Sequence, residues 1–158
     1  MNEETIRAFF EGMLTARELN QTWAQAFAEE PRSDGTVVRR LRTEPLAESY
    51  PVTIRNVGSL IDAVLDGSLG LSALDAICFA MEASDKFEWN IDTDEGERVG
   101  RSLFWLGSPE VNYPLTPTVL SKIRNYVLTG ADTLTRDDLT DKTSSSRVIN
   151  EWESKRGA

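Results

Sequence analysis

Apolar residues recur at helical spacing in six segments of the chain, and this periodicity limits the fold more than any other feature. In the first segment Ile6, Phe9, Phe10 and Met13 fall at positions i, i+3, i+4 and i+7, so they would share one face of a helix. The other segments with this spacing are residues 15–30, 57–67, 72–81, 99–107 and 117–130. The sequence therefore predicts an all-α fold, a helical bundle of about six helices.

Residues with helix-capping chemistry mark several of the predicted helix ends. Thr15 and Glu18 stand three positions apart, which is the spacing of a capping box. The helix that starts there is predicted to continue through Phe27 and to stop before Pro31. Thr116 and Pro117 place a proline at a first helical position, where a missing N–H is tolerated.

Residues 31–56 interrupt the helical pattern with Pro, Ser, Asp and Gly. Thr36–Val38 is predicted as a short strand, so this long irregular connection has room for a short hairpin. The connection is also locally basic, and its bases are Arg32, Arg39, Arg40, Arg42 and Arg55. In a chain with excess acid we expect the run Arg39-Arg40-Leu41-Arg42 to neutralise nearby acids and not to bind nucleic acid.

Length and hydrophobic content predict one domain. A chain of 158 residues that is 40% hydrophobic can bury a core without disulfides or metal. Cys78 lies in an apolar run and is expected to be a buried thiol. We predict a single helical domain over residues 1–134 and a polar tail over residues 135–158, with room for a short helix around Val148 to Trp152.

The charge composition narrows the classes of function. The chain has 17 Lys and Arg residues, 26 Asp and Glu residues and no histidine, and its formal net charge is −9. The absence of histidine excludes catalytic triads, histidine acid/base chemistry and histidine zinc sites. Nucleic acids and anionic membranes repel an acidic surface. A basic protein is therefore the expected partner, and neither catalysis, a cofactor nor a metal is predicted.

The first residues and the hydropathy pattern indicate the cellular compartment in which the protein is expected. Asn2, Glu3 and Glu4 stand where a secretory signal would carry positive charge. No uncharged run approaches the roughly 20 residues that a membrane-spanning helix needs. We therefore expect a cytoplasmic protein.

Acidic residues gather in one part of the chain. Between residues 82 and 97 a single base, Lys86, offsets seven acids, and such crowding is unfavourable unless a partner relieves it. Trp89 stands in the middle, as an aromatic anchor within a charged rim would. The predicted contact residues are Glu82, Asp85, Glu88, Trp89, Asp92, Asp94, Glu95 and Glu97. The alternative that Phe87 and Trp89 are core residues under a solvated loop stays open.

Two other interpretations of the acids are weaker. The segment 90–96 resembles a calcium loop in composition, but an EF-hand that starts at Asn90 would need glycine at Glu95 and glutamate at Arg101. A looser divalent-cation site stays open. Paired carboxylates could serve glycoside hydrolysis, yet among 26 acids such pairs are inevitable and carry almost no information.

The N-terminal segment from Ile6 to Leu19, with its apolar helix, short break and Thr-Ala-Arg-Glu start to the next helix, resembles the opening of colicin D-type and related self-protective colicin-like immunity proteins. The acidic stretch 82–97 is also similar in character to the region that such families present to a nuclease. The likeness covers about a third of the chain. It implies a helical bundle that occupies the basic cleft of a bacterial toxin and keeps the toxin's substrate out.

Three hypotheses follow. The leading one is a bacterial immunity protein that neutralises a toxin, such as a basic nuclease or RNase domain, by covering its active site with an acidic surface. The second is a helical adaptor or assembly factor that binds another protein through an apolar face, almost independently of salt. The third is a carboxylate enzyme, which would require a deep pocket with at least two acids of raised pKa.

Overall fold

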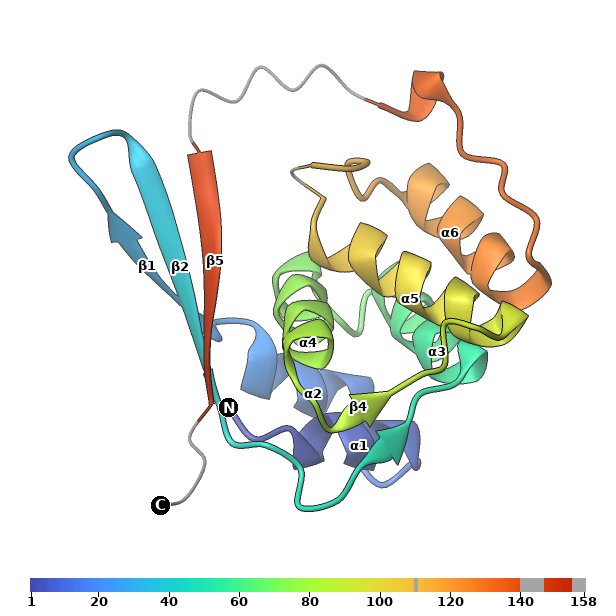
Figure 1. Ribbon diagram of the computed structural model, residues 1–158, viewed down its shortest axis with the longest axis horizontal. Helices are drawn as coiled ribbons and strands as arrows, with labels where there is room; N and C mark the ends of the chain where they lie inside the picture. Colours follow the sequence, from blue (N-terminus) through green and yellow to red (C-terminus); the bar gives the residue numbers. More distant parts are fainter. Residues whose placement is uncertain (110, 140–146, 155–158) are drawn as a thin grey trace.

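The computed structural model describes residues 1–109, 111–139 and 147–154, without the side chains of residues 147–149. Within these residues the chain forms six α-helices, one 3-10 turn and five strands (Figure 1). The helices are α1 (Glu4–Phe10), α2 (Ala16–Trp23), α3 (Ile54–Leu65), α4 (Leu71–Ala83), α5 (Asp94–Gly107) and α6 (Pro117–Thr129), and the 3-10 turn is η1 (Arg136–Asp138). The strands are β1 (Phe27–Pro31), β2 (Thr36–Thr43), β3 (Tyr50–Pro51), β4 (Phe87–Glu88) and β5 (Arg147–Ser154).

The prediction of an all-α bundle is wrong, because the protein is a mixed α/β fold. A three-stranded sheet has the order β1-β2-β5, with β1 antiparallel and β5 parallel to the central strand β2. Helix α2 ends at Trp23, well before the predicted end, and Phe27 begins strand β1. The short helix predicted around residues 148–152 is also wrong, since those residues belong to strand β5.

The connection predicted over residues 31–56 contains the short hairpin for which it had room, formed by β1 and β2, although β1 already begins at Phe27. The strand expected at Thr36–Val38 is confirmed and continues to Thr43. A tight turn joins the two strands: Gly35 has a φ of +83°, and the backbone N–H of Thr36 donates to the Asp34 carboxylate at 2.9 Å. Asp and Gly supply the geometry that such turns need.

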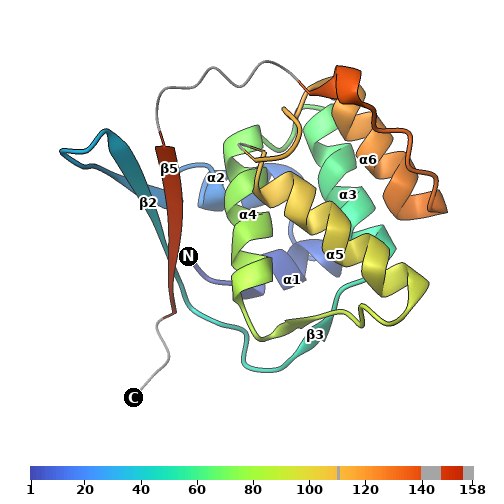
Figure 2. The same ribbon diagram turned by 45° about the horizontal axis from the view of Figure 1, so that its top comes forward.

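The helices form a body on one side of the sheet, with α4 nearest to it (Figures 1 and 2). Helix α4 is the centre of the core, and Leu74, Ile77, Cys78 and Met81 are fully buried. It packs against α5 and α2, while α3 packs against α6. The predicted apolar stripes of these helices therefore meet as expected, although the sheet closes one side of the body.

Helix ends follow the predicted capping chemistry. The Thr15 hydroxyl accepts from the Glu18 N–H, and the Glu18 carboxylate accepts from the Thr15 N–H, at 3.2 and 2.8 Å. These bonds to the charged carboxylate lower the pKa of Glu18. Helix α6 has Pro117 in its first turn and ends at Gly130, which adopts a left-handed φ of +83°.

Strands β3 and β4 form a second, two-stranded parallel sheet that positions the acidic segment. The N–H of Tyr50 donates to the Lys86 carbonyl and the N–H of Val52 donates to the Glu88 carbonyl, both at 2.8 Å. The residues after α4 are thereby tied to those before α3. No helix in the described part of the chain is long and apolar enough to cross a membrane.

Candidate functional site

A hollow of about 640 Å³ opens beside strand β4, at the C-terminal end of α4. It is lined by Pro51, Glu82, Ser84, Phe87, Glu88, Trp89 and Asn90. Three of the predicted contact residues, Glu82, Glu88 and Trp89, therefore meet in one place. The small sheet adds Pro51 to the hollow, because it brings β3 alongside β4.

Trp89 is half-buried and is held in place by helix α5. It packs against Gly100, where an added Cβ atom would lie 2.9 Å from the indole Nε1. Phe87 is only 4% exposed and belongs to the core, so the core interpretation is confirmed for this residue. Trp89 both packs against the core and lines the hollow, as an anchored contact residue would.

Glu82 lies in the last turn of α4, and its carboxylate reaches over Gly107 at the close crossing of α4 and α5. An added Cβ atom at Gly107 would lie 2.9 Å from Glu82 Oε1. No base pairs with Glu82 among the residues that the structure describes. The residue is exposed, but neighbouring atoms desolvate the carboxylate enough to raise its pKa from 4.5 to about 7.

The raised pKa of Glu82 predicts that stability falls as the pH rises from about 4.5 to about 7, because in this range the unfolded chain releases a proton that the folded protein keeps. Below this pH range Glu82 is protonated in both the folded and the unfolded chain, so its charge does not destabilise the fold. The Glu82→Gln variant should therefore gain stability relative to wild type as the pH rises. Solvent screening limits the expected gain to about 1 kcal/mol.

Urea unfolding of wild type and Glu82→Gln at about pH 5 and about pH 8 measures this effect. Glu29→Gln, on the exposed strand β1, controls for the change of net charge. Identical pH profiles for wild type and Glu82→Gln would contradict the assignment.

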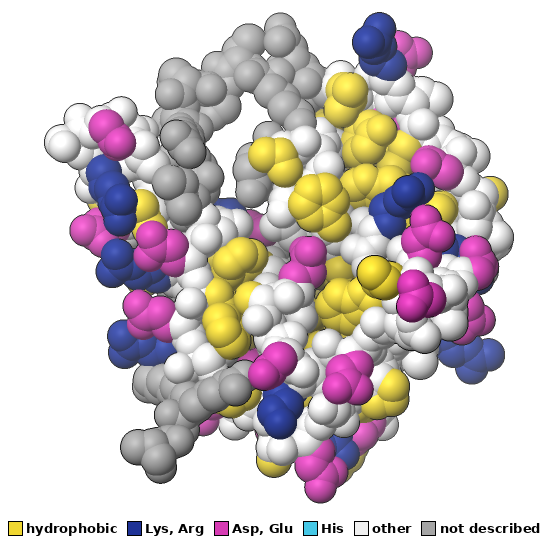
Figure 3. Space-filling view, in the orientation of Figure 1, with side chains coloured by type: hydrophobic (Ala, Val, Ile, Leu, Met, Phe, Trp, Pro, Cys, Tyr) yellow, Lys and Arg dark blue, Asp and Glu magenta, His cyan; other side chains and the backbone are white. Residues whose placement is uncertain are grey.

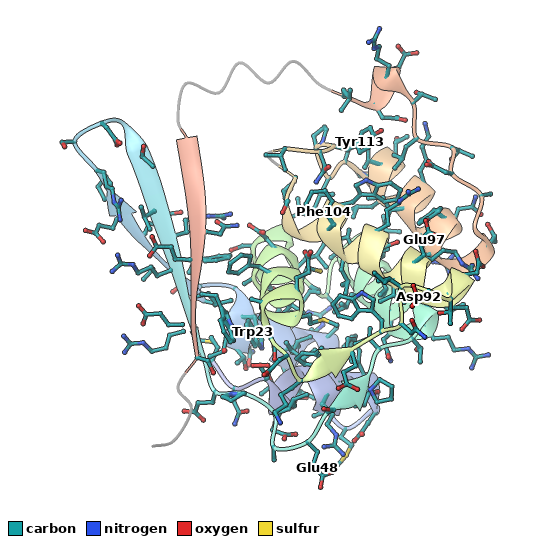
Figure 4. The ribbon with its side chains drawn as sticks, in the orientation of Figure 1. Trp23, Glu48, Asp92, Glu97, Phe104 and Tyr113 are labelled. Atoms are coloured by element: carbon teal, nitrogen blue, oxygen red, sulfur yellow. The ribbon has the colours of Figure 1, made fainter. Side chains whose placement is uncertain are left out.

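Of the remaining predicted acids, all but Asp85 lie at or near the N-terminal end of α5, where Figure 4 shows Asp92 and Glu97. Two of them have partners within the fold: Asp94 pairs with Arg98 at 3.2 Å and Glu97 with Arg101 at 3.7 Å. Arg98 also donates to the Val127 carbonyl, so the first pair helps to join α5 to α6. These two acids are therefore less available to a partner than the sequence suggested.

The other acids of the segment differ in their surroundings. Glu88, Asp92 and Glu95 are exposed, and none of them has an ion-pair partner within the described ranges. Asp85 lies in the turn before β4 and does not line the hollow. We use the term acidic face for Glu82, Glu88, Trp89, Asp92 and Glu95.

The loop before α5 is a helix cap by its geometry. The Asn90 side chain accepts from the Asp92 N–H at 3.0 Å, and the Thr93 hydroxyl accepts from the Gly96 N–H at 3.0 Å. Thr93 also donates to the Asn90 carbonyl at 2.7 Å. Over residues 1–109, 111–139 and 147–154, no group of three or more acids or cysteines is arranged to hold a metal ion.

The arginines of β2 are already paired within the fold. Arg39 pairs with Asp75 at 2.8 Å on the helix side of the sheet. On the other side Arg40 pairs with Glu151 at 2.9 Å and Arg42 with Glu153 at 3.0 Å. Figure 3 shows basic and acidic side chains alternating along the sheet at the left. Near the N-terminal end of α5, at the right, acidic side chains outnumber the basic ones.

Pro51 and Ser84 are lining residues that sequence reasoning missed. Pro51 reaches the hollow only because β3 pairs with β4, and the two-residue strand Tyr50–Pro51 leaves no periodic signal. The Ser84 hydroxyl accepts from the Lys86 N–H at 3.2 Å and shapes the turn into β4. A serine at this position, directly after an apolar helix, indicates a helix end but does not indicate a pocket.

No family model, curated protein or solved structure matches this chain. Its function is therefore inferred from the site.

Proposed function

We propose that this protein is an immunity protein that binds a basic toxin domain through the acidic face and blocks the toxin's active site. The proposal rests on one asymmetry of charge. The arginines of strand β2 pair with acids of the same fold, while the four acids of the acidic face have no such partner in the part of the chain that the structure describes. The protein acts by binding and not by catalysis, and it works in the cytoplasm.

Acids without a base beside them create a negative potential in the solvent around them. Such a potential repels nucleic acids and anionic lipids and attracts a basic protein, which raises the rate of association. Trp89 adds a half-buried aromatic surface beside Glu82 and Glu88. Aromatic residues surrounded by charged rims are typical of the points that carry most binding energy. The resemblance of segment 6–19 to colicin-type immunity proteins favours the same interpretation.

A second candidate function is an adaptor that binds through an apolar face. An exposed apolar patch lies at the C-terminal end of α5 and in the following loop, where Phe104 is 46% exposed and Val111 is 64% exposed. Tyr113 lies close by, as Figure 4 shows, and packs edge-on against Trp105. A partner that bound this patch would be insensitive to salt.

The immunity proposal expects a secreted protein with a basic C-terminal domain to be encoded next to this gene, and the test is binding of that domain. We expect the affinity to fall at least about tenfold between about 50 and about 300 mM NaCl, because salt screens the acidic face. The affinity for that domain at low salt should fall at least about tenfold in the triple variant Glu88→Lys, Asp92→Lys, Glu95→Lys. This variant should no longer protect cells from the domain.

A matched triple variant, Glu29→Lys, Glu44→Lys, Asp137→Lys, changes the net charge equally at exposed positions outside the acidic face. It should retain most of the affinity. Equal losses in both triple variants would show that only net charge matters and would refute the assigned surface. Loss of binding in Phe104→Lys, with no effect of salt, would favour the adaptor.

A further inference from the structure

We propose that the hollow beside β4 binds the guanidinium group of an arginine from the basic partner. The guanidinium plane would lie against Trp89, and its N–H groups would donate to the carboxylates of Glu82 and Glu88. This inference rests on the proposed function, because it names the partner side chain that the acidic face receives.

The lining of the hollow offers hydrogen-bond acceptors and an aromatic surface but no cation. Glu82 comes from the end of α4 and Glu88 from β4, so two acidic residues line the hollow from different elements. Lys86 is the nearest base in the sequence, but it does not line the hollow and forms no ion pair with a described residue. An anionic ligand would be repelled, and a cation would find two acceptors.

The indole of Trp89 is in position before any ligand arrives. Trp89 packs against Gly100, and the Glu82 carboxylate lies over Gly107. Because Glu82 is partly desolvated and has no base beside it, a cation in the hollow would stabilise its charged form. A site whose groups are already placed loses less conformational entropy when it binds.

The lining favours arginine over lysine. A guanidinium is planar and has five N–H donors, so it can donate to two carboxylates while its face stacks on an indole. A guanidinium is also more weakly hydrated than an ammonium group, so it loses less hydration free energy when it is partly buried. A lysine ammonium could reach one carboxylate, but it would gain less from Trp89.

The test uses a short capped peptide of glycine and serine with one central arginine, and a second peptide with lysine in its place. The indole N–H resonance of Trp89, assigned with Trp89→Phe, reports binding. We expect the arginine peptide to bind with a Kd of about 1–10 mM at low salt, which is the range of a single charged contact. The lysine peptide should bind about tenfold more weakly.

Glu82→Gln and Glu88→Gln should each weaken binding of the arginine peptide about tenfold, because each removes one charged acceptor. Glu29→Gln on β1 should leave it unchanged. These glutamine variants keep the test valid even if Trp89→Phe does not fold.

Failure of this inference is distinguishable from failure of the proposed function. If the Trp89 resonance does not move, or if the lysine peptide binds as well as the arginine peptide, the guanidinium site is wrong. The immunity proposal would still stand if the triple variant of the acidic face lost the toxin domain. If the arginine peptide binds and no basic domain does, the site is right and the proposed function is wrong.

Discussion

Replacement of Gly96 by alanine is expected to destabilise the protein by about 3 kcal/mol, the upper range for forcing atoms into a packed site. Gly96 lies in the first turn of α5, where helix propensity alone would favour alanine by about 1 kcal/mol. An added Cβ atom, however, would overlap the carbonyl oxygen of Asn90. The loop before α5 would have to move, and the Thr93 cap would be lost with it.

Urea unfolding of Gly96→Ala measures this effect, and Gly58→Ala is its matched control. Gly58 is also a buried helical glycine, but an added Cβ atom there meets Leu128 at 3.4 Å, an ordinary contact distance. We expect Gly58→Ala to change stability by less than about 1 kcal/mol. If the two variants lose the same free energy of unfolding, Asn90 does not pack closely on Gly96.

The helices could be predicted because their signals are local. Helix α6 has Thr116 and Pro117 at its start and Gly130 at its end, and an apolar stripe lies between them. The capping box of Thr15 and Glu18 needs only residues three positions apart. Such features act within one or two turns, so a single sequence contains them in full.

The sheet could not be predicted because its pairing is distant and its strands are ambiguous. Phe27 continues the helical spacing of Trp23 and so reads as helix, although it begins β1. Strand β5 is rich in polar residues, and its Glu151 and Glu153 become favourable only when they meet Arg40 and Arg42 of β2. That parallel pairing joins residues 111 positions apart, which no local pattern reveals.

The candidate site could be predicted in part. The crowding of acids around Trp89 was visible in composition, and the structure places Glu82, Glu88 and Trp89 around one hollow. The sequence spacing of Asp94 and Arg98, one helical turn apart, also predicts an ion pair. The number of acids in the segment alone does not reveal such pairs. The contribution of Pro51 depends on the small sheet and could not be read from the sequence.

Arg39→Met is expected to destabilise the protein by about 3 kcal/mol, because it removes one partner of a mostly buried ion pair. The Arg39 guanidinium joins three elements to β2. It pairs with Asp75 of α4 at 2.8 Å, donates to Asn150 of β5 at 2.9 Å and lies 4.4 Å from the ring centroid of Phe27 in β1. Loss of these contacts should loosen the attachment of the sheet to the helices.

The adjacent residue of the same strand provides the control. Arg40 pairs with Glu151 at 2.9 Å, almost the distance of the Arg39–Asp75 pair, but its side chain is 44% exposed against 18% for Arg39. Because solvent screens an exposed pair, Arg40→Met should change stability by about 0.5 kcal/mol. A double-mutant cycle of Arg39→Met with Asp75→Asn should give a coupling of about 2 kcal/mol, and the same cycle for Arg40 and Glu151 should give much less. Equal couplings would mean that burial does not set the strength of these pairs.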